Sequence, residues 1–151
     1  MSQPKRIYQT KYLDFYSVDT KTELVVPLFE SPISAGFPSP AEDYIEQKLD
    51  LNKFLIKHPS ATFYVRVKGD SMKNAGIFDG DILIVDKALD PKSGDIAVCI
   101  LDGEFTVKRI RKLKDQLFLV PENPAFEPIK ISESDDFKIW GIVSYVIHKP
   151  W

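Results

Sequence analysis

The second half of this chain alternates apolar and polar residues with a period of two, and this pattern constrains the fold more than any other feature. In the stretch Thr62–Lys68, apolar residues Phe63, Val65 and Val67 occupy alternate positions. Successive side chains of a strand point to opposite faces of a sheet, so this alternation predicts a strand with one buried face.

Further stretches share this short, apolar character and end at turn residues, and we expect strands at 81–86, 95–101, 104–111, 116–120 and 137–148. Between two of them, the dipeptide Asp102-Gly103 is typical of a two-residue hairpin turn that requires positive φ angles. The expected fold is therefore mostly β, a small barrel or sandwich of short strands with tight turns.

The first 35 residues show no sustained helical periodicity, and we expect an extended N-terminal arm whose apolar stretch 24–29 docks on another surface. An N-terminus without any role is the alternative. Three prolines and a glycine in residues 31–40 predict an extended linker. Ser39 as N-cap, Pro40 in the first helical position and Glu42 as the capping-box acid then predict one short helix at about 40–50.

Composition excludes several classes of protein. The 151 residues fit one main domain, and 20 Lys and Arg against 22 Asp and Glu give a net charge of −2, so we expect no strong direct DNA binding. The longest apolar run, Ile96–Leu101, is far shorter than the roughly 18 residues of a membrane span. With one cysteine, Cys99, and no secretory signal, we expect a cytoplasmic protein without a Cys-rich metal site or a cofactor.

The turn Gly69-Asp70-Ser71-Met72 is the first candidate for chemistry. It follows a predicted strand, and Gly76 and Gly80 lie just beyond it. A serine on such a turn can present its hydroxyl together with neighbouring backbone N–H groups, as a nucleophile and an oxyanion hole require. From the residues alone, a serine that only caps the turn is the favoured alternative.

A serine nucleophile needs a base that takes its proton. His58 and His148 are expected to be surface residues or to be satisfied by structural partners. Lys108 lies on a predicted strand face with Thr106 and Ile110, and burial there would lower the pKa of its amine. The alternative is a lysine whose charged end reaches solvent.

Three further positions complete the candidates. The dipeptide Ala35-Gly36 combines two small residues in a segment that cannot form a helix, so it could enter a narrow cleft as a substrate. Cys99 is expected in the core, and Trp140 and Tyr145 are expected to pack in the core or in a dimer contact.

Together these motifs, in this order, resemble the LexA/UmuD family of self-cleaving serine–lysine proteins, and specifically its UmuD branch. The resemblance covers about residues 24–148. Its specific motifs are Gly36-Phe-Pro-Ser-Pro-Ala, His58-Pro-Ser-Ala-Thr, Gly69-Asp-Ser-Met, Asp79-Gly-Asp, Leu83-Ile-Val-Asp and Asp102-Gly-Glu-Phe-Thr-Val-Lys.

The resemblance implies a fold similar to the LexA C-terminal catalytic domain. It implies that Ser71 is the nucleophile, that Lys108 is the general base, and that the backbone N–H groups of Asp70 and Ser71 form the oxyanion hole. It therefore reverses the preference for a turn cap at Ser71 and for a solvated amine at Lys108.

The resemblance also implies a cut between Ala35 and Gly36. Self-cleavage would remove the arm 1–35 and leave 36–151 as a β-rich peptidase and dimerisation domain. RecA filaments on single-stranded DNA would stimulate the cut, and the processed homodimer would serve a UmuC-type Y-family DNA polymerase in translesion synthesis during the SOS response. The resemblance assigns no role to residues 1–23.

Three alternatives remain beside this expectation. The chain could be an interaction module that binds the polymerase or RecA without cleaving. A repressor is disfavoured because the first 35 residues do not predict the two packed helices that read an operator. A signal peptidase is disfavoured because no membrane anchor is apparent.

Overall fold

The computed structural model describes residues 5–23, 25–29 and 45–150. These residues separate into two compact units. The first contains the described residues up to Val18 together with those from His58 onward, and the second contains the described parts of Asp19–Lys57. The candidate catalytic residues lie in the first unit, so its sheet is the scaffold of the site.

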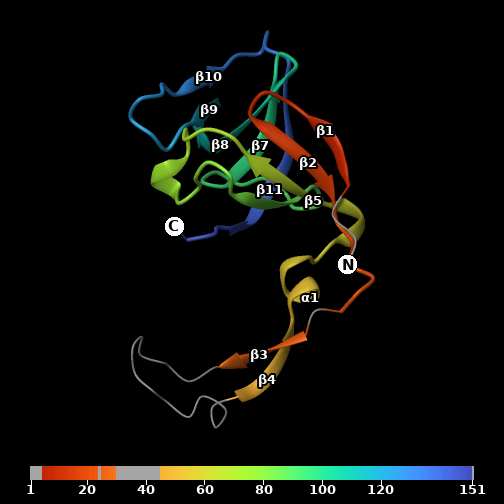
Figure 1. Cartoon of the computed structure of the whole chain (residues 1–151). Helices are drawn as coiled ribbons and strands as arrows, with labels where there is room; N and C mark the ends of the chain where they lie inside the picture. The colour runs from red at the N-terminus through yellow and green to blue at the C-terminus, as the bar shows by residue number, and fades with distance from the viewer. Residues whose placement is uncertain (1–4, 24, 30–44, 151) are drawn as a thin grey trace. The chain divides into compact units, whose positions relative to one another are not determined.

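Among the described residues, nine strands of the first unit form one antiparallel sheet in the order β1-β2-β5-β6-β11-β7-β8-β9-β10 (Figure 1). The strands are β1 Arg6–Gln9, β2 Leu13–Ser17, β5 Thr62–Val67, β6 Ile82–Asp86, β7 Ile96–Leu101, β8 Glu104–Leu113, β9 Gln116–Val120, β10 Ile129–Ile131 and β11 Phe137–Ile147. Tyr8 of β1 packs against Phe105 of β8, although five strands separate β1 from β8 in the order. The sheet therefore curls, and the expected mostly β, barrel-like fold is confirmed.

The hairpin between β7 and β8 forms where the sequence predicts it. Asp102 has φ 49° and Gly103 has φ 83°, so both central residues adopt the positive φ that this tight turn needs. The turn pairs Leu101 with Glu104 and continues down the hairpin to Ile96 and Arg109. This register brings Lys108 opposite Ala97 in the middle of the sheet.

The expected irregular arm contains two strands of this sheet. β1 pairs with β2, and β2 pairs with β5 over five residue pairs. Leu13 is 2% exposed and Phe15 is 1% exposed, and both belong to the main core cluster. The period-two pattern of Leu13, Asp14 and Phe15 is real but too short to predict a strand by itself.

The helix expected at about 40–50 is wrong over the part of that range that the structure describes. Ile45–Asp50 forms strand β4, which pairs antiparallel with β3, Val25–Phe29, in a separate two-stranded sheet. Pairing with a distant segment thus overrides the local capping signal. Ser39, Pro40 and Glu42, which carry that signal, lie outside the described residues.

The α-helix α1 begins only after this strand, at Leu51–Leu55. Asp50 is its N-cap, and the Asp50 carboxylate accepts a hydrogen bond of 3.0 Å from the backbone N–H of Asn52. Such a cap satisfies one of the free N–H groups at the start of a helix. In the described parts of the chain, no helix combines the length and the apolar character that crossing a membrane requires.

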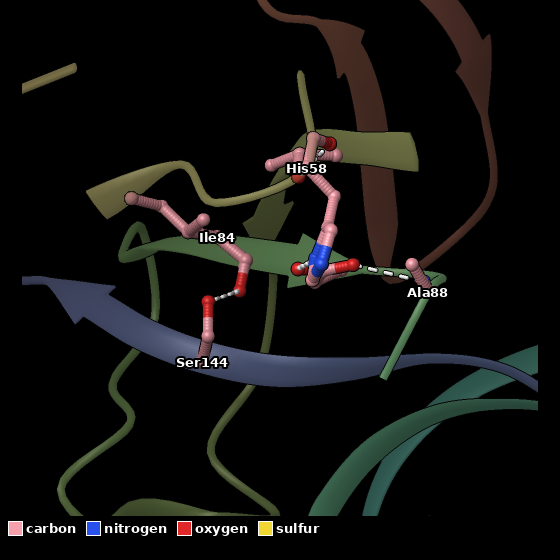
Figure 2. Close-up of polar contacts among 6 residues, drawn as sticks. His58, Ile84, Ala88 and Ser144 are labelled. Atoms are coloured by element: carbon pink, nitrogen blue, oxygen red, sulfur yellow. Dashed lines mark hydrogen bonds and ion pairs between the residues drawn. The ribbon is translucent and has the colours of Figure 1, made fainter. Parts of the chain in front are cut away.

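Polar contacts of β6 hold the neighbouring segments in place (Figure 2). The Nδ1 of His58 lies 2.6 Å from Oδ2 of Asp86, whose other carboxylate oxygen accepts from the backbone N–H of Ala88 at 2.8 Å. On the adjacent strand β11, the hydroxyl of Ser144 donates to the carbonyl of Ile84 at 3.2 Å. His58 is thus a structural residue with a partner, as expected.

Gly141 lies on β11 between β6 and β7, at a position with no space for a side chain. A Cβ at Gly141 would lie 2.6 Å from Cγ1 of Val85 and 3.3 Å from Cγ of Lys87. Val85 is fully buried and cannot move aside without disturbing the core. We expect Gly141→Ala to lower the free energy of unfolding by about 1–3 kcal/mol, measured by urea denaturation.

The control for this prediction is Lys138→Ala, at an exposed position of the same strand. Its free energy of unfolding should change by less than about 0.5 kcal/mol. Equal stabilities of the two variants would contradict the tight contact between Gly141 and Val85.

Candidate active site

Ser71 lies on the turn that follows β5. Gly69 has φ 106°, a left-handed conformation that glycine adopts without strain, and its N–H donates to Oδ1 of Asp79 at 2.8 Å. Beyond Ser71 the chain forms a short 3-10 helix, Lys73–Ala75. The sharp change of direction places Ser71 at the end of the strand, half-buried.

Lys108 approaches this serine from β8. Its side chain is only 9% exposed. The Nζ atom lies 2.6 Å from Oγ1 of Thr106, 3.1 Å from the carbonyl oxygen of Val107 and 3.3 Å from Oγ of Ser71. Burial lowers the pKa of the Lys108 amine from its ordinary value of 10.5, because desolvation disfavours the charged form.

The contacts around the Lys108 amine can be satisfied in its neutral form. A neutral amine has two N–H donors and one lone pair. The carbonyl of Val107 can only accept a hydrogen bond, and the hydroxyl of Thr106 can also accept one. When these oxygens use both N–H groups, the lone pair remains for Ser71. The serine hydroxyl can then donate to the amine, as it must when the amine acts as a base.

A cavity of about 310 Å³ lies at this pair of residues. Both Ser71 and Lys108 line it, so a bound peptide could reach them together. Its other lining residues are mostly apolar and come from β2, β5, β8 and the nearby turns: Tyr12, Leu13, Val67, Lys68, Gly69, Asp70, Met72, Thr106, Val107 and Phe126. A cavity of this character is suited to small, uncharged side chains.

The peptide between Asp70 and Ser71 is held by the loop after β9. The side-chain amide of Asn123 donates to the carbonyl of Asp70 at 2.9 Å, and the N–H of Lys73 donates to the same carbonyl at 3.2 Å. In a trans peptide the N–H points opposite to the carbonyl, so these bonds also set the direction of the Ser71 N–H. Sequence reasoning missed Asn123, because a contact with a distant backbone carbonyl leaves no local pattern.

His148 supports the segment that follows the Ser71 turn in sequence. Its Nδ1 lies 2.6 Å from Oδ1 of Asp81, and Oδ2 of Asp81 accepts from the N–H of Phe78 at 2.8 Å. Asp81 itself is buried. Both histidines therefore pair with aspartates, and Lys108 is the titratable group that the structure places beside Ser71.

Cys99 is buried in the core as expected, on β7 next to β8. Burial raises the pKa of its thiol to about 12, with the nearby Lys108 acting in the opposite direction. Ala35 and Gly36, the expected cleavage site, lie outside the described residues. The structure thus brings Ser71, Lys108 and the Asp70–Ser71 peptide together.

Comparison with known proteins identifies the class of protein and the family to which this curled β sheet belongs. Residues 27–144 match the family described as Peptidase S24-like. The chain belongs to this family, and the resemblance to LexA/UmuD proteins is confirmed.

Three relatives cover most of the chain. Protein SamA of Salmonella typhimurium is 50% identical over 123 residues, which are 82% of this chain and 85% of SamA. Protein ImpA of Escherichia coli is 47% identical over 133 residues, covering 83% and 85% of the two chains. Protein MucA of Escherichia coli is 42% identical over 121 residues, covering 80% and 82%.

The buried thiol generates a prediction on reactivity. The thiolate is the reactive form of cysteine, and burial both raises the pKa of Cys99 to about 12 and blocks access. We expect Ellman's reagent at about pH 8 to leave the folded chain unlabelled. In guanidinium the same reagent should label one thiol per chain, which is the control. Rapid labelling of the folded chain would contradict the burial of Cys99.

Proposed function

We propose that this chain is a serine endopeptidase with a Ser–Lys dyad that hydrolyses its own Ala35–Gly36 bond. The observation that carries the proposal is the 3.3 Å separation between Oγ of Ser71 and Nζ of the buried Lys108, both in the lining of one cavity. Membership of the Peptidase S24-like family supports the reaction class.

The first half of the reaction follows from this geometry. The neutral amine of Lys108 takes the proton from Ser71 as Oγ attacks the carbonyl carbon of Ala35. The backbone N–H groups of Asp70 and Ser71 stabilise the oxyanion. The Lys108 ammonium then protonates the leaving amino group of Gly36, and an ester between Ala35 and Ser71 remains.

Water completes the reaction. Lys108, neutral again, takes a proton from the water that attacks the ester carbonyl. The ester bond breaks, Ser71 recovers its hydroxyl proton from Lys108, and Ala35 ends as a carboxylate. The net reaction is the hydrolysis of one peptide bond. Because burial lowers the pKa of Lys108, its amine can return to the neutral form between steps.

The biological setting of the proposal comes from the resemblance. RecA filaments on single-stranded DNA stimulate the cut in the cytoplasm. Residues 36–151 then form a homodimer that serves as accessory subunit of a UmuC-type Y-family polymerase in SOS translesion synthesis. The identity to SamA, ImpA and MucA over about four fifths of the chain supports this placement. The net charge of −2 suits action through protein partners rather than direct DNA binding.

The dyad assignment is tested with two variants. We expect Ser71→Ala and Lys108→Ala each to reduce self-cleavage by at least about a thousandfold, because each removes an essential half of one catalytic unit. Purified protein is incubated at alkaline pH, or with RecA on single-stranded DNA, and fragments beginning at Gly36 are quantified by mass spectrometry. Circular dichroism should report an unchanged β fold in both variants.

Matched controls separate the dyad from general damage. Ser144→Ala removes a serine hydroxyl on β11, and Lys112→Ala removes an exposed lysine on the same strand as Lys108. Both should cleave at the wild-type rate. If the wild-type chain yields no fragment under either condition, the chain is an interaction module and the proposal is wrong.

The pH dependence of cleavage tests the role of the amine. The neutral amine is the active form, and burial lowers the Lys108 pKa from 10.5, so the cleavage rate should rise with pH and level off below 10.5. Below its pKa the rate should rise about tenfold per pH unit. Single-turnover rates are measured on gels between about pH 6 and pH 11. A rate that begins to level off only above 10.5 would show that Lys108 is not desolvated.

A further inference from the structure

We infer that the proposed cut leaves residues 5–18 bound in the catalytic sheet, so that each processed protomer consists of two chains. The inference rests on the proposed cleavage at Ala35–Gly36 and departs from the expectation that the arm 1–35 is lost. It follows from the contacts of β1 and β2, which precede the cut in sequence and yet belong to the first unit.

β2 is an interior strand of the sheet, paired along both of its edges. β2 lies between β1 and β5, as Figure 1 shows for the red and orange strands beside β5. Five residue pairs join β2 to β5, from Leu13 opposite Val67 to Ser17 opposite Phe63. Departure of β2 would therefore leave a row of N–H and C=O groups on β5 without their partners.

The side chain of Phe15 packs against residues that follow the cut. Its ring centroid lies 4.8 Å from that of Phe105 on β8 and 4.9 Å from that of Trp140 on β11, both in edge-on geometry. Tyr8 of β1 adds a ring contact with Phe105 at 5.6 Å. Phe15 and Leu13 are almost fully buried, so their loss would expose the apolar interior of the sheet to water.

Polar contacts reinforce the same attachment. The carboxylate of Asp14 is buried and pairs with Nζ of Lys68 at 3.1 Å. The backbone N–H of Lys68 donates to the carbonyl of Tyr12 at 2.7 Å. Removal of the segment would deprive Lys68 of both of these partners. Lys68 lies immediately before the turn that carries Ser71.

The attached segment also forms part of the candidate site. Tyr12 and Leu13 line the same cavity as Ser71 and Lys108. Leu13 belongs to the same core cluster as Met72, the residue after the nucleophile. The cut at Ala35 breaks none of these contacts, because all of them lie between residues 5–18 and residues from His58 onward. Hydrolysis removes only the covalent tether, and the non-covalent contacts decide whether the fragment stays.

The test compares native and denaturing measurements on the full-length protein. After cleavage of the wild-type chain, native mass spectrometry and gel filtration should show both fragments in one complex, which separates only in denaturant. A large fragment eluting alone under native conditions would overturn the inference.

A second substrate keeps this test independent of self-cleavage. In a full-length Ser71→Ala chain, the segment 31–36 is replaced by a thrombin site of equal length, and thrombin makes the cut. Retention of the fragment after thrombin treatment supports the inference even when wild-type self-cleavage fails. Release of the fragment here overturns it even when self-cleavage succeeds.

Interface variants of the thrombin substrate test the cause of retention. Phe15→Ala should release the fragment at least about tenfold faster on dilution than the parent, because it removes the buried ring. Ile7→Ala, at a position of β1 that is 49% exposed, is the matched control and should behave like the parent. Phe15→Leu is a milder second variant in case Phe15→Ala does not fold, and its release rate should be intermediate. Equal release from the Phe15 variants and Ile7→Ala would overturn the role of this contact.

Discussion

The buried amine of Lys108 is the constraint on which the site depends. Removing an ammonium group from water is costly, and each unit by which its pKa falls corresponds to about 1.4 kcal/mol. The sheet reduces this cost by favouring the neutral form and by offering the oxygens of Thr106 and Val107 to its N–H groups. The amine lies on an interior strand of the sheet, since β8 is flanked by β7 and β9.

The hydroxyl of Ser71 lies 3.3 Å from this amine, and contacts from distant parts of the chain hold the turn that carries the serine. Asn123, in the loop after β9, holds the carbonyl of Asp70. Asp79 holds the N–H of Gly69, and His148 holds Asp81 beyond the turn. These polar contacts bracket Ser71 in sequence from Gly69 to Asp81. The turn that carries Ser71 is therefore positioned by the sheet as a whole rather than by its own short sequence, and the proposed nucleophile needs such preorganisation.

The strands from β5 onward, except β10, could be predicted from sequence because their signals are local. Alternation with a period of two marks β5, and Asp102-Gly103 marks the hairpin of β7 and β8. Ser71 is a candidate from its glycine-flanked turn and Lys108 from its strand face, and the characteristic order of the motifs then favours both over the structural alternatives. The helix expected at 40–50 failed where Ile45–Asp50 pairs with β3, since a capping signal does not report a distant strand. The hydrogen bond from Asn123 to Asp70 and the ion pair of Asp14 with Lys68 join distant segments of the chain. Neither contact leaves a local pattern in the sequence.

The N-terminal segment combines two demands that usually conflict. A segment that serves as substrate must leave the site, whereas a segment that completes a sheet must stay. Here the two demands fall on different stretches of sequence: β1 and β2 supply the sheet contacts, and the bond proposed for cleavage follows them in sequence, after Val18. Hydrolysis at the proposed bond therefore breaks neither the burial of Phe15 in the core nor the place of Leu13 in the cavity wall. Residues from both sides of the bond proposed for cleavage therefore build the core and the cavity that Lys108 lines.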